Sequence, residues 1–287
     1  MTIPAKAGGR LAAILRGGHF AVTGEIVPPR SGSGAAVTEH ARALVGSIDA
    51  ANITDNPTAS AHMSAAAGAS FVAAAGIEPT LQLTVRDRNR LGITAELLGG
   101  WALGARNVLC LSGDPISIGD HPDAKVVNDL SVLDAVGLVR RLREEGVTMS
   151  GAEVDDPPRY LIGVADLPLA EPYDVEALAA WAEVVRARGV FERAPVLIGM
   201  VPLRSAKGAR FMNDKLPGVR VPPAMLQALE AAGDDAEEVG RALTIEVVHG
   251  IRQIAGVSGV HLMGMGHDAT VRAVVEGAGL FPRPTGA

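Results

Sequence analysis

The 287-residue sequence predicts an α/β fold of the TIM (β/α)8-barrel type, with one compressed or missing βα unit around residues 148–195. Three observations predict this fold. Short, near-continuous runs of Val, Ile, Leu and Ala, typical of buried parallel strands, alternate with helical patterns from end to end. The length suits one such barrel. No linker interrupts the alternation, so residues 1–287 are expected to form a single domain.

Seven apolar runs are the expected strands. They are 20–27, 48–54, 80–85, 107–112, 160–165, 196–201 and 260–265. Eight helical patterns are expected at 37–44, 61–75, 94–105, 130–143, 175–189, 223–232, 236–255 and 269–277. Residues 1–18 are expected to be an N-terminal helix and lead-in, and 281–287 a Pro/Gly tail that frays. With seven strands, either an unrecognised strand or part of the loop 148–158 would have to close the barrel.

Composition narrows the class of protein. Apolar residues make up 48%, which is enough for a large core, and aromatic residues only 3%. The net charge is −6 and no run of five basic residues occurs, so we expect no nucleic-acid or anionic-membrane surface. No apolar run reaches the length of a membrane span. Cys110, the single cysteine, has no disulfide partner within the chain, and no cysteine cluster points to a metal, so a cytoplasmic protein is expected.

Polar residues lie at or just after the end of each predicted strand. They are Glu25, Asp55, Arg86 with Asp87, Asp114, Asp166, Arg204 and His267. The carboxyl ends of parallel barrel strands converge on one mouth, where active sites are built. Helix caps and turn acids also follow strands, but residues after all seven strands favour a shared site.

Several ordered motifs resemble the methylenetetrahydrofolate reductase family. They are TGEIVPPR (23–30), NITDNP (52–57), QLTVRDRNR (82–90), NVLCLSGDP (107–115), VPLRSAKGARF (201–211) and PGVRVP (217–222). The resemblance implies a barrel enzyme that transfers a hydride to the methylene carbon of 5,10-methylenetetrahydrofolate, giving 5-methyltetrahydrofolate. Whether the protein forms a homo-oligomer is left open.

The resemblance also implies two catalytic residues. Glu25 matches the family's general acid, which protonates N10 so that the five-membered ring opens to a 5-iminium cation. Asp114 matches the aspartate placed against the pterin, where a carboxylate can accept from the 2-amino and N3–H groups and stabilise the cation. The structural alternatives are a turn glutamate for Glu25 and a cap or turn acid for Asp114.

Other residues are assigned to binding, each with a structural alternative such as an ion pair, a cap or a solvated helix face. The expected folate contacts are Asp55, Asn56, Gln82, Asp114 and Arg204. The expected contacts to a nicotinamide dinucleotide are Arg86, Lys207, Gly264, Gly266 and His267. Residues 264–269 satisfy a weak G-x-G-x-x-A pattern at a predicted helix start. Arg204, Lys207 and Arg210 are alternative phosphate partners.

The sequence departs from the flavin-containing members of that family. The fifth-strand segment runs directly into Tyr173 to Leu178, which resembles the segment that follows the family's sixth strand. The resemblance therefore implies the deletion of one helix and one strand. The deletion would remove the folate-binding glutamine, for which Ala170 is the nearest counterpart, and the charged helix that holds flavin. Ala206 replaces the aromatic residue that stacks on folate. The resemblance is therefore to flavin-free members, in which NADH or NADPH donates the hydride directly and FAD is absent.

Three alternatives stay open at this point. A conventional FAD-dependent reductase could have replaced the missing helix. Loss of the glutamine and the stacking aromatic could instead indicate a catalytically silent folate-binding subunit. An aldolase is disfavoured because none of the four lysines lies in a predicted strand, where a Schiff-base lysine would be needed.

Overall fold

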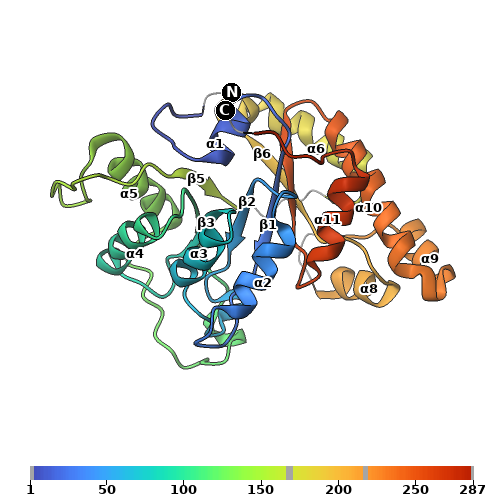
Figure 1. Ribbon diagram of the computed structural model, residues 1–287, viewed down its shortest axis with the longest axis horizontal. Coiled ribbons are helices and arrows are strands. Elements are labelled where there is room, and N and C mark those ends of the chain that lie inside the picture. Colours follow the sequence, from blue (N-terminus) through green and yellow to red (C-terminus); the bar gives the residue numbers. More distant parts are fainter. Residues whose placement is uncertain (1–2, 166–170, 216–218, 286–287) are drawn as a thin grey trace.

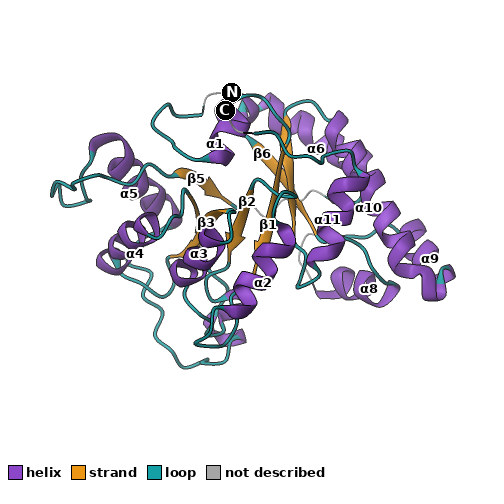
Figure 2. Cartoon of the chain, in the orientation of Figure 1, coloured by secondary structure: helices purple, strands orange, loops and turns teal. Residues whose placement is uncertain are grey.

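The computed structural model describes residues 3–165, 171–215 and 219–285, which build a curled, fully parallel sheet of seven strands (Figure 2). The strands are β1 (Ala21–Ile26), β2 (Ala50–Ile53), β3 (Glu78–Thr84), β4 (Asn107–Leu111), β5 (Leu161–Val164), β6 (Val196–Met200) and β7 (Val257–Leu262). Their order in the sheet is β5-β4-β3-β2-β1-β7-β6. The predicted α/β barrel class is confirmed, as an incomplete barrel.

The barrel is open between β5 and β6. These strands are consecutive in the chain, yet they form the two edges of the sheet. Between them the described residues form only α6 (Val175–Ala187) and α7 (Val190–Arg193), so the missing βα unit falls inside the predicted interval 148–195. The loop after α5 does not fill the gap. It folds back on itself through an isolated antiparallel bridge between Val147 and Glu153.

Helices follow the strands and cover the outside of the sheet (Figure 1). Besides α6 and α7, the described helices are α1 (Arg10–Arg16), α2 (Ala35–Leu44), α3 (Ala65–Ala74), α4 (Arg90–Ala102), α5 (Val132–Glu145), α8 (Ala206–Lys215), α9 (Pro223–Ala231), α10 (Ala236–Gln253) and α11 (Asp268–Gly277). Every predicted helix is present. Three starts moved because of caps. Ser64 accepts a hydrogen bond from Ala67 N at the start of α3, Asn89 accepts one from Gly92 N at the start of α4, and Ser131 forms a capping box at the start of α5.

Three elements differ from the prediction, and one of them is the four-residue helix α7, which no helical pattern predicted. The last strand begins at Val257, three residues before the expected start at 260, because Ser258 and Gly259 interrupt its apolar run. Gly259 is needed there: a Cβ would lie 2.3 Å from the Ala21 carbonyl oxygen across the β1–β7 pair. Helix α8 was not predicted, because Ala209 and Met212 are its only buried apolar residues.

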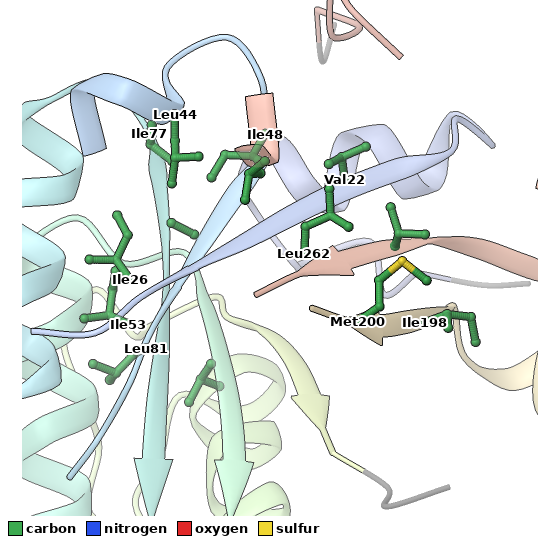
Figure 3. Packing of buried hydrophobic residues seen from close by; sticks show 14 of the residues in the cluster. Val22, Ile26, Leu44, Ile48, Ile53, Ile77, Leu81, Ile198, Met200 and Leu262 are labelled. Carbon is green, nitrogen blue, oxygen red and sulfur yellow. The ribbon is translucent and has the colours of Figure 1, made fainter. Parts of the chain in front are cut away.

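Side chains alternate between the two faces of each strand. Outward residues such as Ile26, Ile53 and Leu81 pack under the helices in the main hydrophobic core (Figure 3). Inward residues on the concave face are polar in the middle of the sheet: Thr23, Glu25, Asn52, Gln82 and His261. This alternation separates a structural face from one that can hold chemistry.

Helix α1 closes the amino-terminal end of the open sheet. Leu11, Ile14 and Leu15 pack in a second apolar cluster against Ala21 and Ala50 at the starts of β1 and β2. Leu161 on β5 and Leu197 on β6, the two edge strands of the sheet, pack against the same cluster. The carboxylate of Glu78 accepts hydrogen bonds from the first N–H groups of the helix, including Leu11 N at 2.9 Å. The predicted N-terminal helix is thus confirmed, and it spans the gap at its base.

The C-terminal tail is anchored as far as Arg283, so the expectation of fraying was wrong there. The Arg283 side chain is 3% exposed and binds the carboxylate of buried Asp49, with Nη2 2.6 Å from Oδ2. Nη2 also donates to the Phe20 carbonyl oxygen. Asp49 in turn accepts from Val22 N at 2.8 Å. Arg10 Nη2 also donates to the Pro284 carbonyl oxygen, so the C-terminal segment lies beside α1, a contact that no local pattern in a Pro/Gly-rich tail indicates.

Among the residues that the structure describes, no helix has both the length and the apolarity needed to cross a bilayer.

We predict that Arg283→Ala destabilises the protein by about 3–5 kcal/mol, because it leaves the Asp49 carboxylate buried with too few partners. Urea unfolding followed by circular dichroism measures the change. Arg272→Ala is the control, since Arg272 pairs with Glu276 on an exposed helix face and should contribute about 0–1 kcal/mol. Equal unfolding midpoints for Arg283→Ala and the wild type would contradict the anchoring role.

Candidate active site

Glu25 lies on the concave face near the end of β1, and its side chain is 16% exposed. Pairing with β2 sets Glu25 opposite Asn52. On the other side, β7 brings His261 close, with Nε2 4.0 Å from Glu25 Oε2. The predicted general acid is thus partly shielded and has the His261 imidazole beside it.

His261 is a site residue that the sequence analysis missed. Its Nδ1 lies 2.9 Å from Thr23 Oγ1, and Thr23 is its register partner across the β1–β7 pair. Thr23 and Glu25 are two residues apart on one strand, so both face the same ring. The available signal was a histidine inside an otherwise apolar strand.

Asp55 is buried at the end of β2 and its carboxylate is fully engaged. Arg88 forms a two-pronged ion pair with it, at 2.7 Å to Oδ2 and 2.9 Å to Oδ1. Thr84 donates to Oδ2 from both N–H and hydroxyl at 2.9 Å. Asp55 therefore joins the ends of β2 and β3, and a folate contact would have to compete with these bonds.

Arg86 holds a second set of contacts at the same end of the sheet. Its guanidinium is buried and binds Asp87 through Nε and Nη2, both at 2.7 Å, while Nη1 donates to the Asp114 carbonyl oxygen at 2.9 Å. The hydrogen bond from Arg86 lowers the pKa of Asp87, and the same bond raises the pKa of Arg86. Asn56 Nδ2 lies 3.3 Å from Asp87 Oδ2. Arg86 is thus committed to internal partners rather than presented to a dinucleotide.

Asp114 remains accessible after β4. It is exposed, and its Oδ2 accepts a hydrogen bond from Thr58 N at 2.7 Å. That bond joins the loop after β4 to the 3-10 turn η1 (Pro57–Ala59), where Asn56, Thr58 and Ala59 have φ between 48° and 53°. Such angles strain non-glycine residues. Asp114 therefore helps to hold a strained turn, and no donor from the described part of the chain occupies its Oδ1.

Gln82 points to the concave face from β3. It is half-buried, and within the described ranges its amide has no hydrogen-bond partner. Two residues earlier, the buried Thr80 hydroxyl also lacks one. Unsatisfied polar groups at this depth suit a ligand with its own donors and acceptors.

The residues predicted to bind a dinucleotide after β6 and β7 form a separate group. Arg204 pairs with Glu237 through two 3.1 Å bonds. Lys207 is exposed in the first turn of α8. Gly266 has φ +82°, and exposed His267 stands at the N-cap position of α11 without a capping hydrogen bond from its side chain. Buried Gly264 leaves no room for a side chain, because a Cβ would lie 2.9 Å from Val271.

The structure thus brings the predicted residues together in two groups on either side of Glu25. Asp55, Asn56, Arg86 and Asp114 surround the ends of β2, β3 and β4, and the Arg204 to His267 group follows β6 and β7. Strand β1, with Glu25, lies between β2 and β7. Asp166 and Ala170 lie outside the described residues. Within the described ranges, no three His, Cys, Asp or Glu side chains cluster as a metal site would require. Burial raises the pKa of the Cys110 thiol to about 12, as for an unreactive core residue.

We predict that Arg86→Ala lowers stability by about 1–3 kcal/mol at neutral pH, because Asp87 and the Asp114 carbonyl lose their donor. The pKa of Asp87 is lowered in the folded state, so the pair contributes above the unfolded value of about 4 and its contribution is lost as the pH falls through the folded pKa. The difference from wild type, measured by urea unfolding, should therefore narrow below about pH 4. A constant difference would contradict this origin. Arg90→Ala, which removes a solvated pair with Asp129, is the control and should change stability far less.

Comparison of sequences relates the chain to known enzymes. The sequence model of the methylenetetrahydrofolate reductase family matches residues 10–173 and 172–279. The two matched segments meet where the sequence analysis places the deletion. "Methylenetetrahydrofolate reductase 1" of Schizosaccharomyces pombe is 25% identical over 225 residues, and "Methylenetetrahydrofolate reductase 2" is 26% identical over 238 residues. These matches cover 71% and 72% of this chain but only 36% of each relative, so the chain spans about a third of their length.

Solved structures share the fold at low sequence identity. An uncharacterized Clostridium thermocellum protein that binds two copies of 5-methyl-5,6,7,8-tetrahydrofolic acid has a TM-score of 0.53 and 13% identity, covering 91% of this chain and 96% of that one. DmoA from Hyphomicrobium sulfonivorans has a TM-score of 0.57 and 10% identity, covering 91% and 87%. With the family match over most of its length, the chain belongs to the methylenetetrahydrofolate reductase family.

Proposed function

We propose that this protein reduces 5,10-methylenetetrahydrofolate to 5-methyltetrahydrofolate with a hydride taken directly from NADH or NADPH, without FAD. Membership of the family supports the substrate and the reaction. The observation that carries the flavin-free mechanism is the missing βα unit between β5 and β6. The family resemblance assigns the flavin-binding helix and the folate-binding glutamine to that unit.

Glu25 is the proposed acid. Opening the imidazolidine ring requires a proton on N10, and a partly shielded carboxyl group on the concave face is suited to donate it. The carboxylate left behind then lies near the 5-iminium cation and stabilises it. Proton donation and stabilisation of the cation both follow from the position of Glu25 on β1.

Asp114 and Gln82 are the proposed pterin contacts. Asp114 is exposed and has one carboxylate oxygen without a partner in the described chain, so it can accept from the pterin edge. Gln82 offers an unpaired amide on the concave face. Asp55 and Asn56 support the site indirectly, because their side chains already bind Arg88 and Asp87.

The open seam supports direct transfer. The inward residues that follow Leu161 and Leu197 on the two edge strands are both glycines, Gly163 and Gly199. Gly199 is exposed and is the register partner of His261. At Gly199 an added Cβ would meet only Met263 Cε, 3.7 Å away, whereas at Gly163 Leu109 Cδ1 lies 3.1 Å from that position, so the β6 edge is the more open of the two. Reduced nicotinamide supplies the hydride when its ring is held against the pterin. Lys207 and the Gly264 to His267 turn are the proposed phosphate contacts, while Arg204 is already paired with Glu237.

An absorption spectrum of the untreated protein, followed by an assay without added flavin, tests the proposal. We expect no flavin band and oxidation of NADH or NADPH that depends on methylenetetrahydrofolate. A bound flavin at unit stoichiometry would instead establish the FAD-dependent alternative. Folate binding without turnover would establish a silent subunit.

We predict that Glu25→Gln lowers kcat by about 10²- to 10⁴-fold, because the amide cannot protonate N10. Folate binding, followed by isothermal titration calorimetry, should survive the change, since Gln keeps the size of the side chain. Glu246→Gln, on the outer helix α10, is the matched control and should keep wild-type kcat. Comparable kcat values for Glu25→Gln and the wild type would exclude Glu25 as the acid.

A further inference from the structure

The proposed reaction consumes one proton in each turnover. A hydride from the nicotinamide and a proton on N10 convert the methylene bridge into a methyl group. Glu25 therefore ends each cycle as a carboxylate and must be protonated again before the next. Near neutral pH an ordinary carboxyl group is mostly ionised, so a nearby proton donor would matter.

His261 is placed to be that donor. Its Nε2 lies 4.0 Å from Glu25 Oε2, a separation that one bridging water or a small side-chain rotation turns into a hydrogen-bonded path. Its Nδ1 is held 2.9 Å from Thr23 Oγ1. Both the His261 and the Glu25 side chains are 16% exposed, so the pair is shielded yet in contact with water.

Among the described residues, Glu25 is the one acidic side chain whose carboxylate lies within 4.0 Å of the His261 ring nitrogens. From β1, Glu25 and the uncharged Thr23 hydroxyl face the imidazole. From β6, the register partner is Gly199, which has no side chain. The next inward residue toward the base of β6, Leu197, is apolar and packs against the α1 cluster. Glu25 is therefore the group with which the ring is placed to exchange a proton.

We propose that His261 is a positioning residue that acts through Glu25 and returns a proton to it in each cycle; this inference rests on the proposed function. The imidazolium N–H at Nε2 breaks as an O–H forms on Glu25 Oε2. The neutral ring keeps its proton on Nδ1, where Thr23 Oγ1 accepts it. Nε2 then takes a new proton from water. Atoms and charge balance without any further reactant.

The pH dependence of kcat tests this role. At saturating substrates we expect His261→Gln to lower kcat about 10- to 100-fold at pH 8, where hydronium is scarce, and to approach wild type near pH 6. Both KM values should stay within about twofold, because His261 is not assigned to substrate contact. His249→Gln, on the exposed face of α10, is the matched control and should behave as wild type.

Three further variants keep the test decisive if His261→Gln fails to fold. Imidazole added to His261→Ala should restore kcat at pH 8, a rescue that a merely structural role would not allow. Thr23→Val should reproduce part of the loss with the same pH dependence, and Thr23→Ser should restore it.

A loss that is equal at all pH values, confined to KM, or not rescued by imidazole would overturn the inference while leaving the proposed function in place. A wild-type protein that does not oxidise NADH or NADPH with methylenetetrahydrofolate would overturn both.

Discussion

The unpaired edges of β5 and β6 are the constraint on which the architecture depends. A closed barrel pairs every strand edge, whereas the outer edges of β5 and β6 are paired with no described strand. Helix α1 compensates at the base, where Leu161 and Leu197 from the two edges share its apolar cluster. Glu78 holds the start of that helix, and the buried pair of Asp49 and Arg283 ties the chain end to the same place. The sheet is thus closed by packing at its base and left open above it.

The concave face divides its polar residues into two kinds. Asp55, Arg86, Asp87 and Arg88 neutralise one another and join the loops after β2, β3 and β4. Because those charges are already paired, they contribute rigidity rather than ligand contacts. Glu25, Gln82 and one oxygen of Asp114 accept or donate no hydrogen bond within the segments that the structure describes, so they can bind a ligand. The chemistry we propose therefore depends on a few groups. The paired charges around them hold the surrounding loops rigid before a ligand binds.

Sequence patterns were most reliable where the interactions are local. The alternating apolar runs and helical segments predicted every strand and every outer helix except α7 and α8, because burial of one face imposes a period that can be read directly. Cap residues such as Asn89 and Ser131 were also local signals, and attention to them would have corrected the helix starts. The deletion was visible in the sequence because the segment after the fifth strand resembles the one that follows the sixth strand in the flavin-containing members of the family.

The side chains that contact one another over long distances in the sequence were not predictable in the same way. Nothing near Arg283 indicates Asp49, 234 positions away, and nothing near Thr23 indicates His261, 238 positions away. From the sequence alone came the barrel class, the family resemblance and the residues at the strand ends. Only the tertiary structure decided which of those residues neutralise one another, which remain available and which histidine faces Glu25. The physical reason is that strand order and register, rather than distance along the chain, determine which side chains meet across a parallel sheet.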